Sequence, residues 1–429
     1  MSIINKIIYR RDTCRLCLSK NIGEVLKLQS TPIGEAYIPK ELLEEEQTKY
    51  PVDLFLCRDC GHVQIADVIS PSELYKKYIY QTKHSLGLTE HFERYAEYVL
   101  KIVNLPKESL VVDIGSNDGS LLKSFKKREM RIVGVDPAED IANEATIAGV
   151  ETLPKLFNVE TAKEIRNKHG TAQVITANNA FANIDNLHEI IDGVKELLAS
   201  GGVFIFETGY LLNVLQKIIF DNIYHEHLSY FSIIPAQKFF AENGLELIDV
   251  YWVSTKGGSI RCSVQLAGGP RKVQKSVNYF VNLEYDLKIH NINAYNNFEL
   301  NINQMKDQTF NLVKSLKDER RMIVGYGASV TVTGILFNFE IGNGLLDFLV
   351  DDNPIRHNLY SPGFHLPVYS SEKIYEDYPD YIIILAWQYA KPIIMKHVKY
   401  LENGGNFIIF QPQLKIINKY NYASEIANG

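Results

Sequence analysis

The chain has 429 residues, a formal net charge of −6 at pH 7 and 46% hydrophobic residues. A chain of that length holds two or three domains with sizeable cores. Its charge balance excludes a strong overall attraction to nucleic acid or to anionic membranes. No apolar stretch of signal-peptide length opens the sequence, and the longest late apolar run, residues 381–387, is too short to span a bilayer. We therefore expect a cytoplasmic protein with no membrane or nucleic-acid partner.

Four of the five cysteines form two CxxC pairs near the N-terminus: Cys14 with Cys17, and Cys57 with Cys60. Two such pairs suit a tetrahedral Zn²⁺ site, and in a reducing compartment the pattern favours a metal over disulfides. Four sulfur ligands leave no open position, so the metal is expected to be structural. Two unrelated pairs of buried thiols, or a redox pair, are the alternatives. Cys262 stands alone in an apolar strand and is expected in the core.

Short apolar strands alternate with helical patterns from about residue 109 onward. The expected strands are 110–114, 131–135, 174–177 and 203–206, and, after a helical stretch at 272–318, 322–324, 346–350, 381–385 and 407–410. Such alternation indicates parallel sheets with helices on both faces. The predicted fold is α/β, with a zinc-ribbon-like module, a central Rossmann-like domain and a second, C-terminal Rossmann-like α/β domain. The expected boundaries are 1–72, 73–290 and 291–429.

A turn with two glycines follows the first of these strands, at residues 113–119. Glycine lets the backbone turn sharply and approach a ligand closely. The pattern is not the dinucleotide motif G-x-G-x-x-G. An acidic residue at the strand end and two spaced glycines suit a zwitterionic amino-acid ligand better than a pyrophosphate. A plain tight turn is the alternative.

Polar side chains also end the neighbouring strands. Asp136 follows the second strand, where a carboxylate can accept both hydroxyls of a ribose; a helix N-cap is its alternative role. Asn178 and Asn179 end a later strand at the same rim, where ligands of open sheets bind. The predicted cofactor-binding site consists of Asp113, Gly115, Asn117, Gly119, Asp136, Asn178 and Asn179.

Proton-transfer groups are concentrated in residues 221–230, which include Tyr224-His225-Glu226-His227. Two histidines flanking a glutamate indicate a catalytic or substrate-binding segment. His227 can act as a general base near neutral pH, because the reference pKa of histidine is about 6.5. Glu226 can polarise it or hold a substrate hydroxyl, and Tyr224 can donate a hydrogen bond to a developing oxyanion. A metal site is the alternative, although no third His or Cys ligand is evident.

The C-terminal part contains half of a Rossmann fingerprint. The segment 325–329 follows a strand, Asp351 and Asp352 end the next one, and Val330 stands where a third glycine belongs. Independent NAD binding is one interpretation. We instead expect this domain to close over the substrate and to contribute backbone amides near a phosphate.

Taken together, these motifs resemble the sugar C-methyltransferases of branched deoxysugar biosynthesis, and the resemblance covers nearly the whole chain. The motifs that carry it are the paired CxxC knuckles, Tyr-x-Tyr at 78–80, Asp-x-Gly-x-x-x-Gly at 113–119, Asn-Asn at 178–179, Tyr-His-Glu-His-Leu-Ser-Tyr at 224–230, Gly-Gly-Ser-x-Arg at 257–261 and Tyr-Gly-Ala-Ser at 326–329.

This resemblance implies a class I methyltransferase in residues 73–290 that uses S-adenosylmethionine. The implied small-molecule substrate is a nucleotide-linked 4-keto-deoxysugar, methylated at C3. His227 would remove the proton next to the ketone, and the resulting enolate would attack the cofactor methyl group. Tyr224, Glu226 and Tyr80 match active-site positions of that family. A monomer is expected.

Two residues depart from the family pattern. Asn183 replaces an active-site histidine, so it can form hydrogen bonds but cannot shuttle a proton. Thr331 stands where the family tends to have a lysine, which removes a charge that would contact the nucleotide diphosphate. These changes indicate a divergent branch with a shifted substrate or an altered proton relay. The alternatives are an O- or N-methyltransferase acting on a surface-glycan or sugar-nucleotide precursor, and a non-catalytic zinc-ribbon binding protein.

Overall fold

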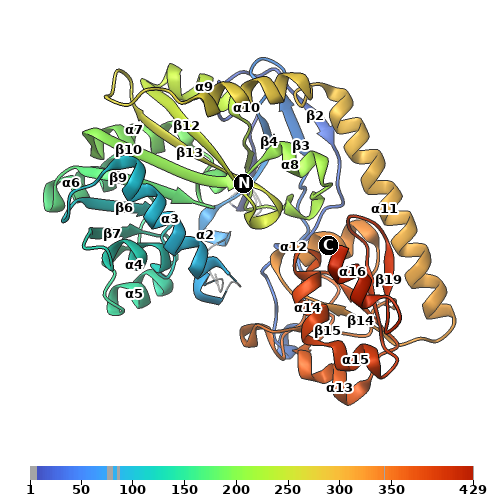
Figure 1. Cartoon of the computed structure of the whole chain (residues 1–429). Helices are drawn as coiled ribbons and strands as arrows, with labels where there is room; N and C mark the ends of the chain where they lie inside the picture. The colour runs from blue at the N-terminus through green and yellow to red at the C-terminus, as the bar shows by residue number, and fades with distance from the viewer. Residues whose placement is uncertain (1–6, 75–80, 85–86, 343, 429) are drawn as a thin grey trace. The chain divides into compact units, whose positions relative to one another are not determined.

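The computed structural model describes residues 7–74, 81–84, 87–342 and 344–428 (Figure 1). The chain forms two compact units that interleave along the sequence. The first comprises residues 1–24, 54–213 and 226–291, and the second comprises residues 25–53, 214–225 and 292–429. Both are mixed α/β structures, which confirms the predicted fold class. The domain boundaries predicted from the sequence stay predictions.

A seven-stranded sheet forms the centre of the first unit, with the strand order β12-β13-β10-β9-β6-β7-β8. Strands β10, β9, β6, β7 and β8 run parallel, and β13 is antiparallel to both of its neighbours. The carboxyl ends of the parallel strands therefore share one rim. The strands are β6 (Leu110–Ile114), β7 (Arg131–Val135), β8 (Thr152–Leu153), β9 (Ala172–Asn178), β10 (Leu198–Gly209), β12 (Leu245–Val253) and β13 (Ser259–Leu266).

Helices connect these strands and bury apolar side chains against the sheet. Two of them, α3 and α4, pack together over a core that includes side chains of β6, β9 and β10. Asn158 and Asn186 begin α6 and α7, because each side-chain oxygen accepts a backbone N–H three residues onward. The helices are α2 (Pro71–Leu74), α3 (Leu88–Val103), α4 (Ser120–Lys126), α5 (Glu139–Ile147), α6 (Val159–His169), α7 (Leu187–Leu197), α9 (Ile233–Glu242) and α10 (Lys275–Asp286). A further helix, α8 (Leu211–Gln216), begins in the first unit and ends in the second.

Two small sheets accompany the cysteine knuckles. One pairs β1 (Ile8–Arg10) with β5 (Asp67–Ile69). The other has the order β11-β4-β3-β2, with β11 (Ser229–Tyr230), β4 (Val63–Ile65), β3 (Leu54–Cys57) and β2 (Ile22–Leu26). Ser229 is opposite Gln64 and Tyr230 is opposite Val63. A strand that follows the predicted catalytic segment therefore extends the sheet of the cysteine module.

A six-stranded sheet forms the centre of the second unit, with the order β16-β15-β14-β17-β18-β19. All pairs are parallel except β18 with β19. The strands are β14 (Ile323–Tyr326), β15 (Leu349–Asp351), β16 (Val368–Ser370), β17 (Tyr381–Ile384), β18 (Asn406–Ile409) and β19 (Lys415–Ile417). The helices are α11 (Ile292–Asp318), α12 (Val330–Phe339), α13 (Ile374–Asp377), α14 (Ala390–Lys396), α15 (Val398–Glu402) and α16 (Tyr422–Asn428).

The strands predicted at 110–114 and 131–135 are confirmed residue for residue. Strand β10 is longer than the predicted 203–206, because it starts at Leu198 and passes an irregularity in its pairing before Val203. The helical stretch predicted over 272–318 is divided into α10 and α11. Among the residues described, no helix combines the length and apolar character needed to cross a membrane.

Candidate functional site

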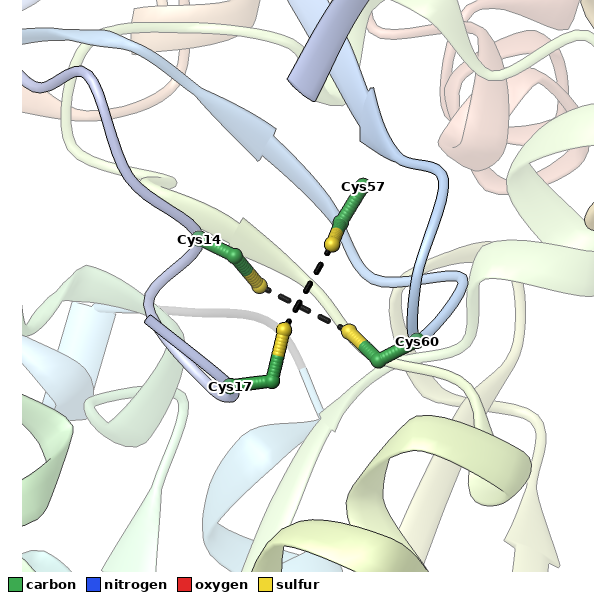
Figure 2. Close-up of side chains that lie close together, drawn as sticks. All are labelled: Cys14, Cys17, Cys57 and Cys60. Atoms are coloured by element: carbon green, nitrogen blue, oxygen red, sulfur yellow. Dashed lines mark hydrogen bonds between the residues drawn. The ribbon is translucent and has the colours of Figure 1, made fainter. Parts of the chain in front are cut away.

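The four paired cysteines converge on one point, as Figure 2 shows. The sulfur atoms of Cys14 and Cys60 lie 3.6 Å apart, those of Cys17 and Cys57 lie 3.5 Å apart, and all four lie within 4.8 Å of one another. A tetrahedron with metal–sulfur bonds of about 2.3 Å has edges of about 3.8 Å, so the four sulfur atoms fit Zn²⁺. The separations are too long for disulfide bonds.

Local backbone geometry makes each knuckle a tight turn. The N–H of Leu18 donates to the carbonyl of Cys14 at 3.0 Å, and the N–H of Gly61 donates to the carbonyl of Cys57 at 2.9 Å. Gly61 has a φ of +85°, which glycine adopts without strain. Cys262 is buried in β13 and takes no part in the cluster, as expected.

At the rim of the seven-stranded sheet, Asp113 is the penultimate residue of β6, and its carboxyl group is buried. Its oxygen Oδ1 accepts a hydrogen bond of 2.6 Å from the hydroxyl of Thr176 on β9. Burial is the main reason why the pKa of Asp113 is raised to about 7, and the neighbouring charge of Asp136 raises it further. No positively charged group of the described chain is among the causes of this shift, so a cationic ligand would stabilise the ionised form of Asp113.

The glycine turn lies directly against the loop after β9. A side chain at Gly115 would place its Cβ 2.5 Å from the Cβ of Ala180, and Gly115 has a φ of +72°. Glycine is therefore required at this position. Gly119 begins α4, also with a positive φ of +73°.

Asp136 holds the glycine turn from the end of β7. Its Oδ2 accepts the N–H of Asn117 at 2.8 Å, and its Oδ1 accepts the N–H of Ala138 at 2.9 Å. The second contact is not the helix N-cap that the sequence left open, because Ala138 is the N-cap residue of α5 and no side chain caps it. Each oxygen of Asp136 keeps another lone pair for a ribose hydroxyl. Burial raises the pKa of Asp136.

Asn178 is the last residue of β9, in the middle of the same rim, and Asn179 directly follows it. Neither amide atom of Asn178 has a hydrogen-bond partner in the described chain, although the side chain is close to the hydroxyl of Tyr95. The buried hydroxyl of Ser116 in the glycine turn is also without a partner there. Buried polar atoms of this kind require a partner. These unpaired donors and acceptors therefore fit a polar cofactor at the carboxyl ends of β6, β7 and β9.

The predicted catalytic segment lies between the 3-10 helix η4 (Phe220–Asn222) and β11. Tyr224 and His227 are partly exposed, whereas Glu226 is buried. His225 is buried, contacts the carbonyl of Tyr50 through Nε2 at 3.2 Å, and has its pKa lowered to about 4 by burial. His225 is therefore neutral and part of the packing. The structure offers no support for the metal alternative, because the cysteine cluster is the one metal-like group in the described chain.

Asn183 lies in the 3-10 helix η3 (Phe181–Asn183), and its buried Oδ1 has no partner among the described residues. The ring of Phe181 in the same helix stacks on Phe231, with centroids 5.3 Å apart. The N–H of Leu211, just beyond β10, donates to the carbonyl of Phe231 at 2.9 Å. The structure thus brings Asn183 and the chain that follows His227 to the same rim as the predicted cofactor residues.

Tyr80 lies outside the described residues. The chain that follows it is attached to the glycine turn, because the N–H of Thr82 donates to Oδ1 of Asn117 at 2.9 Å. The N–H of Lys83 likewise donates to Oδ2 of Asp118 at 2.8 Å.

Sequence reasoning missed Glu207, which lies on β10 directly beside Asn178. Its buried carboxylate contacts Nε2 of His91 at 2.7 Å and accepts two hydrogen bonds from Arg261, at 2.9 and 2.8 Å. Burial opposes ionisation, but His91 and Arg261 outweigh it and lower the pKa of Glu207. The Gly-Gly-Ser-x-Arg motif signalled Arg261, but nothing in the sequence pointed to its partner.

The helix that follows the expected phosphate-facing loop of the C-terminal sheet contacts an N-terminal segment of the same unit. A Cβ at Gly34 would lie 2.6 Å from the carbonyl oxygen of Val330, and the hydroxyl of Thr333 donates to the carbonyl of Gly34 at 3.2 Å. Residue 34 therefore packs on the first turn of α12. Asp351 accepts the N–H groups of Ala328 and Asn353, at 2.6 and 2.7 Å.

Comparison with known proteins shows which class of enzyme this chain belongs to. Three family models match in succession: a zinc binding domain over residues 14–75, a methyltransferase domain over 88–250 and a C-methyltransferase C-terminal domain over 254–412. The C-methyltransferase NovU of Streptomyces niveus is 32% identical over 407 residues, which are 95% of this chain and 97% of that protein. The chain is a zinc-binding, S-adenosylmethionine-dependent methyltransferase. It belongs to the C-methyltransferase family that includes NovU.

Solved structures are more distant. An S-adenosylmethionine-dependent methyltransferase of Clostridium acetobutylicum is 15% identical, with 46% of this chain and 96% of that chain covered and a TM-score of 0.35. Magnesium protoporphyrin IX methyltransferase of Synechocystis with bound SAH is 16% identical, with 42% and 84% covered and a TM-score of 0.33. Both structures are too distant to indicate the function of this chain.

Proposed function

We propose that the protein transfers a methyl group from S-adenosylmethionine to C3 of a nucleotide-linked 4-keto-deoxysugar, with His227 as the base that forms the enolate. The observation that carries the proposal is similarity to NovU along almost the whole chain, together with the Tyr-His-Glu-His block at 224–227. We further propose that the protein acts in the cytoplasm as a monomer.

The cofactor residues have distinct roles in this proposal. The bound cofactor supplies a methyl group on a positively charged sulfur. Asp136 accepts ribose hydroxyls with the lone pairs that its two backbone contacts leave over. Asn178 offers an unpaired amide at the rim, and Asp113 faces the cationic part of the ligand. The absence of a side chain at Gly115 lets the turn approach both the ligand and Ala180.

His227 takes the C3 proton on a ring nitrogen, and the electron pair of the broken C–H bond moves into the enolate. Tyr224 donates a hydrogen bond to the enolate oxygen, which develops negative charge next to C3. The enolate carbon would then take the methyl group that the bound cofactor supplies, and the electron pair of the broken carbon–sulfur bond would stay with the cofactor. Glu226 orients His227 or holds a substrate hydroxyl.

Asn183 restricts where the proton can go afterwards. Its amide can donate and accept hydrogen bonds but cannot take up a proton. Its unpaired Oδ1 is therefore assigned to substrate recognition, and the proton leaves His227 for solvent.

The test uses His227→Ala with thymidine-diphosphate-linked 4-keto-6-deoxyhexoses as probes. We expect turnover to fall about 10²–10⁴-fold, as is typical when a general base is removed, with the affinity for S-adenosylhomocysteine unchanged. In D₂O without methyl donor, exchange of the C3 proton, followed by NMR, should fall equally. Undiminished turnover would remove His227 as the base.

Product NMR separates the alternatives. A new methyl group on a quaternary carbon supports the proposal. A methyl group on oxygen or nitrogen assigns the protein to O- or N-methylation, with His227 deprotonating a hydroxyl or amine.

A further inference from the structure

Arg15 lies inside the first cysteine knuckle, between the metal ligands Cys14 and Cys17, and its side chain is fully buried. Its Nε donates to Oδ1 of Asp185 at 2.9 Å. Its Nη1 donates to two backbone carbonyls, of Ile65 at 2.5 Å and of Leu228 at 3.1 Å. One guanidinium group therefore connects three segments of the first unit that are far apart in the sequence.

Two of these segments carry predicted active-site residues. Leu228 directly follows His227, and Asp185 is two residues after Asn183 at the end of η3. The carbonyl of Leu228 also accepts the N–H of Ile65 at 3.0 Å, where β11 joins β4. The guanidinium thus reinforces the point at which the catalytic segment enters the sheet of the cysteine module.

Burying a guanidinium group is expensive. An arginine side chain stays charged at neutral pH in proteins, and the carboxylate of Asp185 pairs with this one. A well-packed apolar residue in such a place is often at least as favourable for stability. Stability alone therefore does not explain why a charged arginine is buried here. The contacts of Arg15 offer another reason, because they hold three chain segments in one arrangement.

We propose that Arg15 is a positioning residue that fixes the His227 and Asn183 segments relative to each other, so that the zinc knuckle aligns the active site. The inference rests on the proposed function of His227. Zn²⁺ bound by Cys14 and Cys17 would hold the backbone on both sides of Arg15. The rigidity of a structural metal site is thereby passed through one side chain to the catalytic segment.

The chain provides a matched control in its second knuckle. Arg58 occupies the same place between Cys57 and Cys60, but its side chain is exposed. Arg15→Met removes five donors while nearly keeping the apolar volume, and Arg58→Met makes the same change without touching the catalytic segment. Arg15→Lys keeps the charge but cannot reproduce the fork of donors.

Purified variants are compared by zinc content, by affinity for S-adenosylhomocysteine and by steady-state kinetics with a thymidine-diphosphate-linked 4-keto-6-deoxyhexose. We expect Arg15→Met to keep its zinc and its cofactor affinity within about twofold, and to lose kcat about 10–100-fold with little change in KM. Arg15→Lys should recover part of the loss, and Arg58→Met should behave as wild type. If Arg15→Met is insoluble, the positioning role is tested with Arg15→Lys and Asp185→Asn instead. A smaller loss of kcat is expected in each of these variants.

A substrate-free measurement separates this inference from the proposed function. The imidazole signal of His227 in ¹³C-histidine-labelled protein, assigned with His227→Ala, should shift in Arg15→Met and not in Arg58→Met. In the double variant Arg15→Met/His227→Ala, the kinetic losses should not add. If His227→Ala keeps full turnover, the proposed base is wrong, while the imidazole signal still decides the positioning role. An unchanged signal, an equal effect in Arg58→Met or additive losses would overturn the role of Arg15.

Discussion

The two large sheets of this chain begin alike and differ at the carboxyl ends of their parallel strands. In each, a glycine-containing turn follows the first strand, and an aspartate lies at the end of the next one: Asp136 directly follows β7, and Asp351 is the last residue of β15. At the seven-stranded rim, Asn178 keeps two unpaired amide atoms. At the six-stranded rim, Gly34 packs on the first turn of α12. The same sequence fingerprint therefore occurs at a rim with unpaired polar atoms and at a rim where a distant segment packs on the adjoining helix.

The six-stranded rim also differs because its polar side chains form hydrogen bonds with one another. The hydroxyl of Tyr326 contacts Oδ2 of Asp352 and Nε2 of His397, both at 3.0 Å, and the hydroxyl of Tyr375 contacts Nδ1 of His397 at 2.9 Å. Burial lowers the pKa of His397 to about 4, so the ring is neutral. Lys396 pairs with Asp352 at 2.5 Å. Each titratable group in this network already has a partner.

Removal of zinc is expected to have the largest effect and to act on the first unit alone. Cys57→Ser/Cys60→Ser removes two of four ligands, and binding of a structural Zn²⁺ is worth on the order of 10 kcal/mol in small zinc domains. We expect loss of zinc by elemental analysis, a much lower melting temperature, and faster hydrogen exchange in β3, β4 and β11. The six-stranded sheet should keep its protection.

Cys262→Ser is the control, because this buried cysteine belongs to the same unit but not to the metal cluster. It should keep its zinc. A zinc-free double variant with an unchanged melting temperature would contradict the assignment of a structural metal.

Asp136 and Asp351 occupy matching places in the two sheets, so the same substitution in each tests whether only one rim binds the cofactor. Asp136→Asn and Asp351→Asn each weaken contacts with two backbone N–H groups, so both should lose roughly 1–3 kcal/mol of stability. Asp136→Asn alone should also weaken binding of S-adenosylmethionine, by about 10–100-fold, because an amide cannot accept two ribose hydroxyls as a carboxylate can. Isothermal titration calorimetry measures the affinity, and thermal unfolding measures the stability. Equal losses of cofactor affinity in both variants would refute the assignment of the two rims.

How far the sequence could predict these rims depends on the range of the interactions. Strand ends with Asp113 and Asp136 follow from local apolar patterns and turn chemistry, and the cysteine spacing alone indicated the metal cluster. No local pattern reveals that Gly34 packs on Val330, nearly three hundred residues away in the sequence. Pairing across such distances is decided by the packing of the whole unit.

Buried charges were missed for the same reason. Glu207 reads as one more residue of an apolar strand, and only its partners His91 and Arg261 make its burial tolerable. Arg15 reads as a surface residue of a zinc knuckle, as its counterpart Arg58 is. A buried ion is recognised from its partners, and these come from distant parts of the chain.

The smallest effect that we predict is a pH dependence of cofactor binding, which arises from the carboxyl groups at the two rims. Asp352 has Lys396 beside it, and although burial acts against ionisation, Lys396 and two hydroxyl donors lower its pKa. Among the described residues, no basic group offsets the burial of Asp113, whose pKa is raised to about 7. Binding of a cationic cofactor should supply the missing charge and release a proton from Asp113.

Cofactor affinity should therefore rise with pH. In the free protein Asp113 is protonated below about pH 7, and binding of the cofactor removes this proton. If binding lowers the pKa of Asp113 by about two units, the affinity for S-adenosylmethionine should be roughly five- to tenfold weaker at pH 6 than at pH 7.5. Calorimetry at pH 6.5 in buffers of different ionisation enthalpy counts the released proton, and Asp113→Asn should abolish the dependence on buffer. A buffer-independent enthalpy in the wild type would mean that the cationic part of the cofactor lies elsewhere, because a buried carboxyl group with this pKa cannot meet a positive charge and keep its proton.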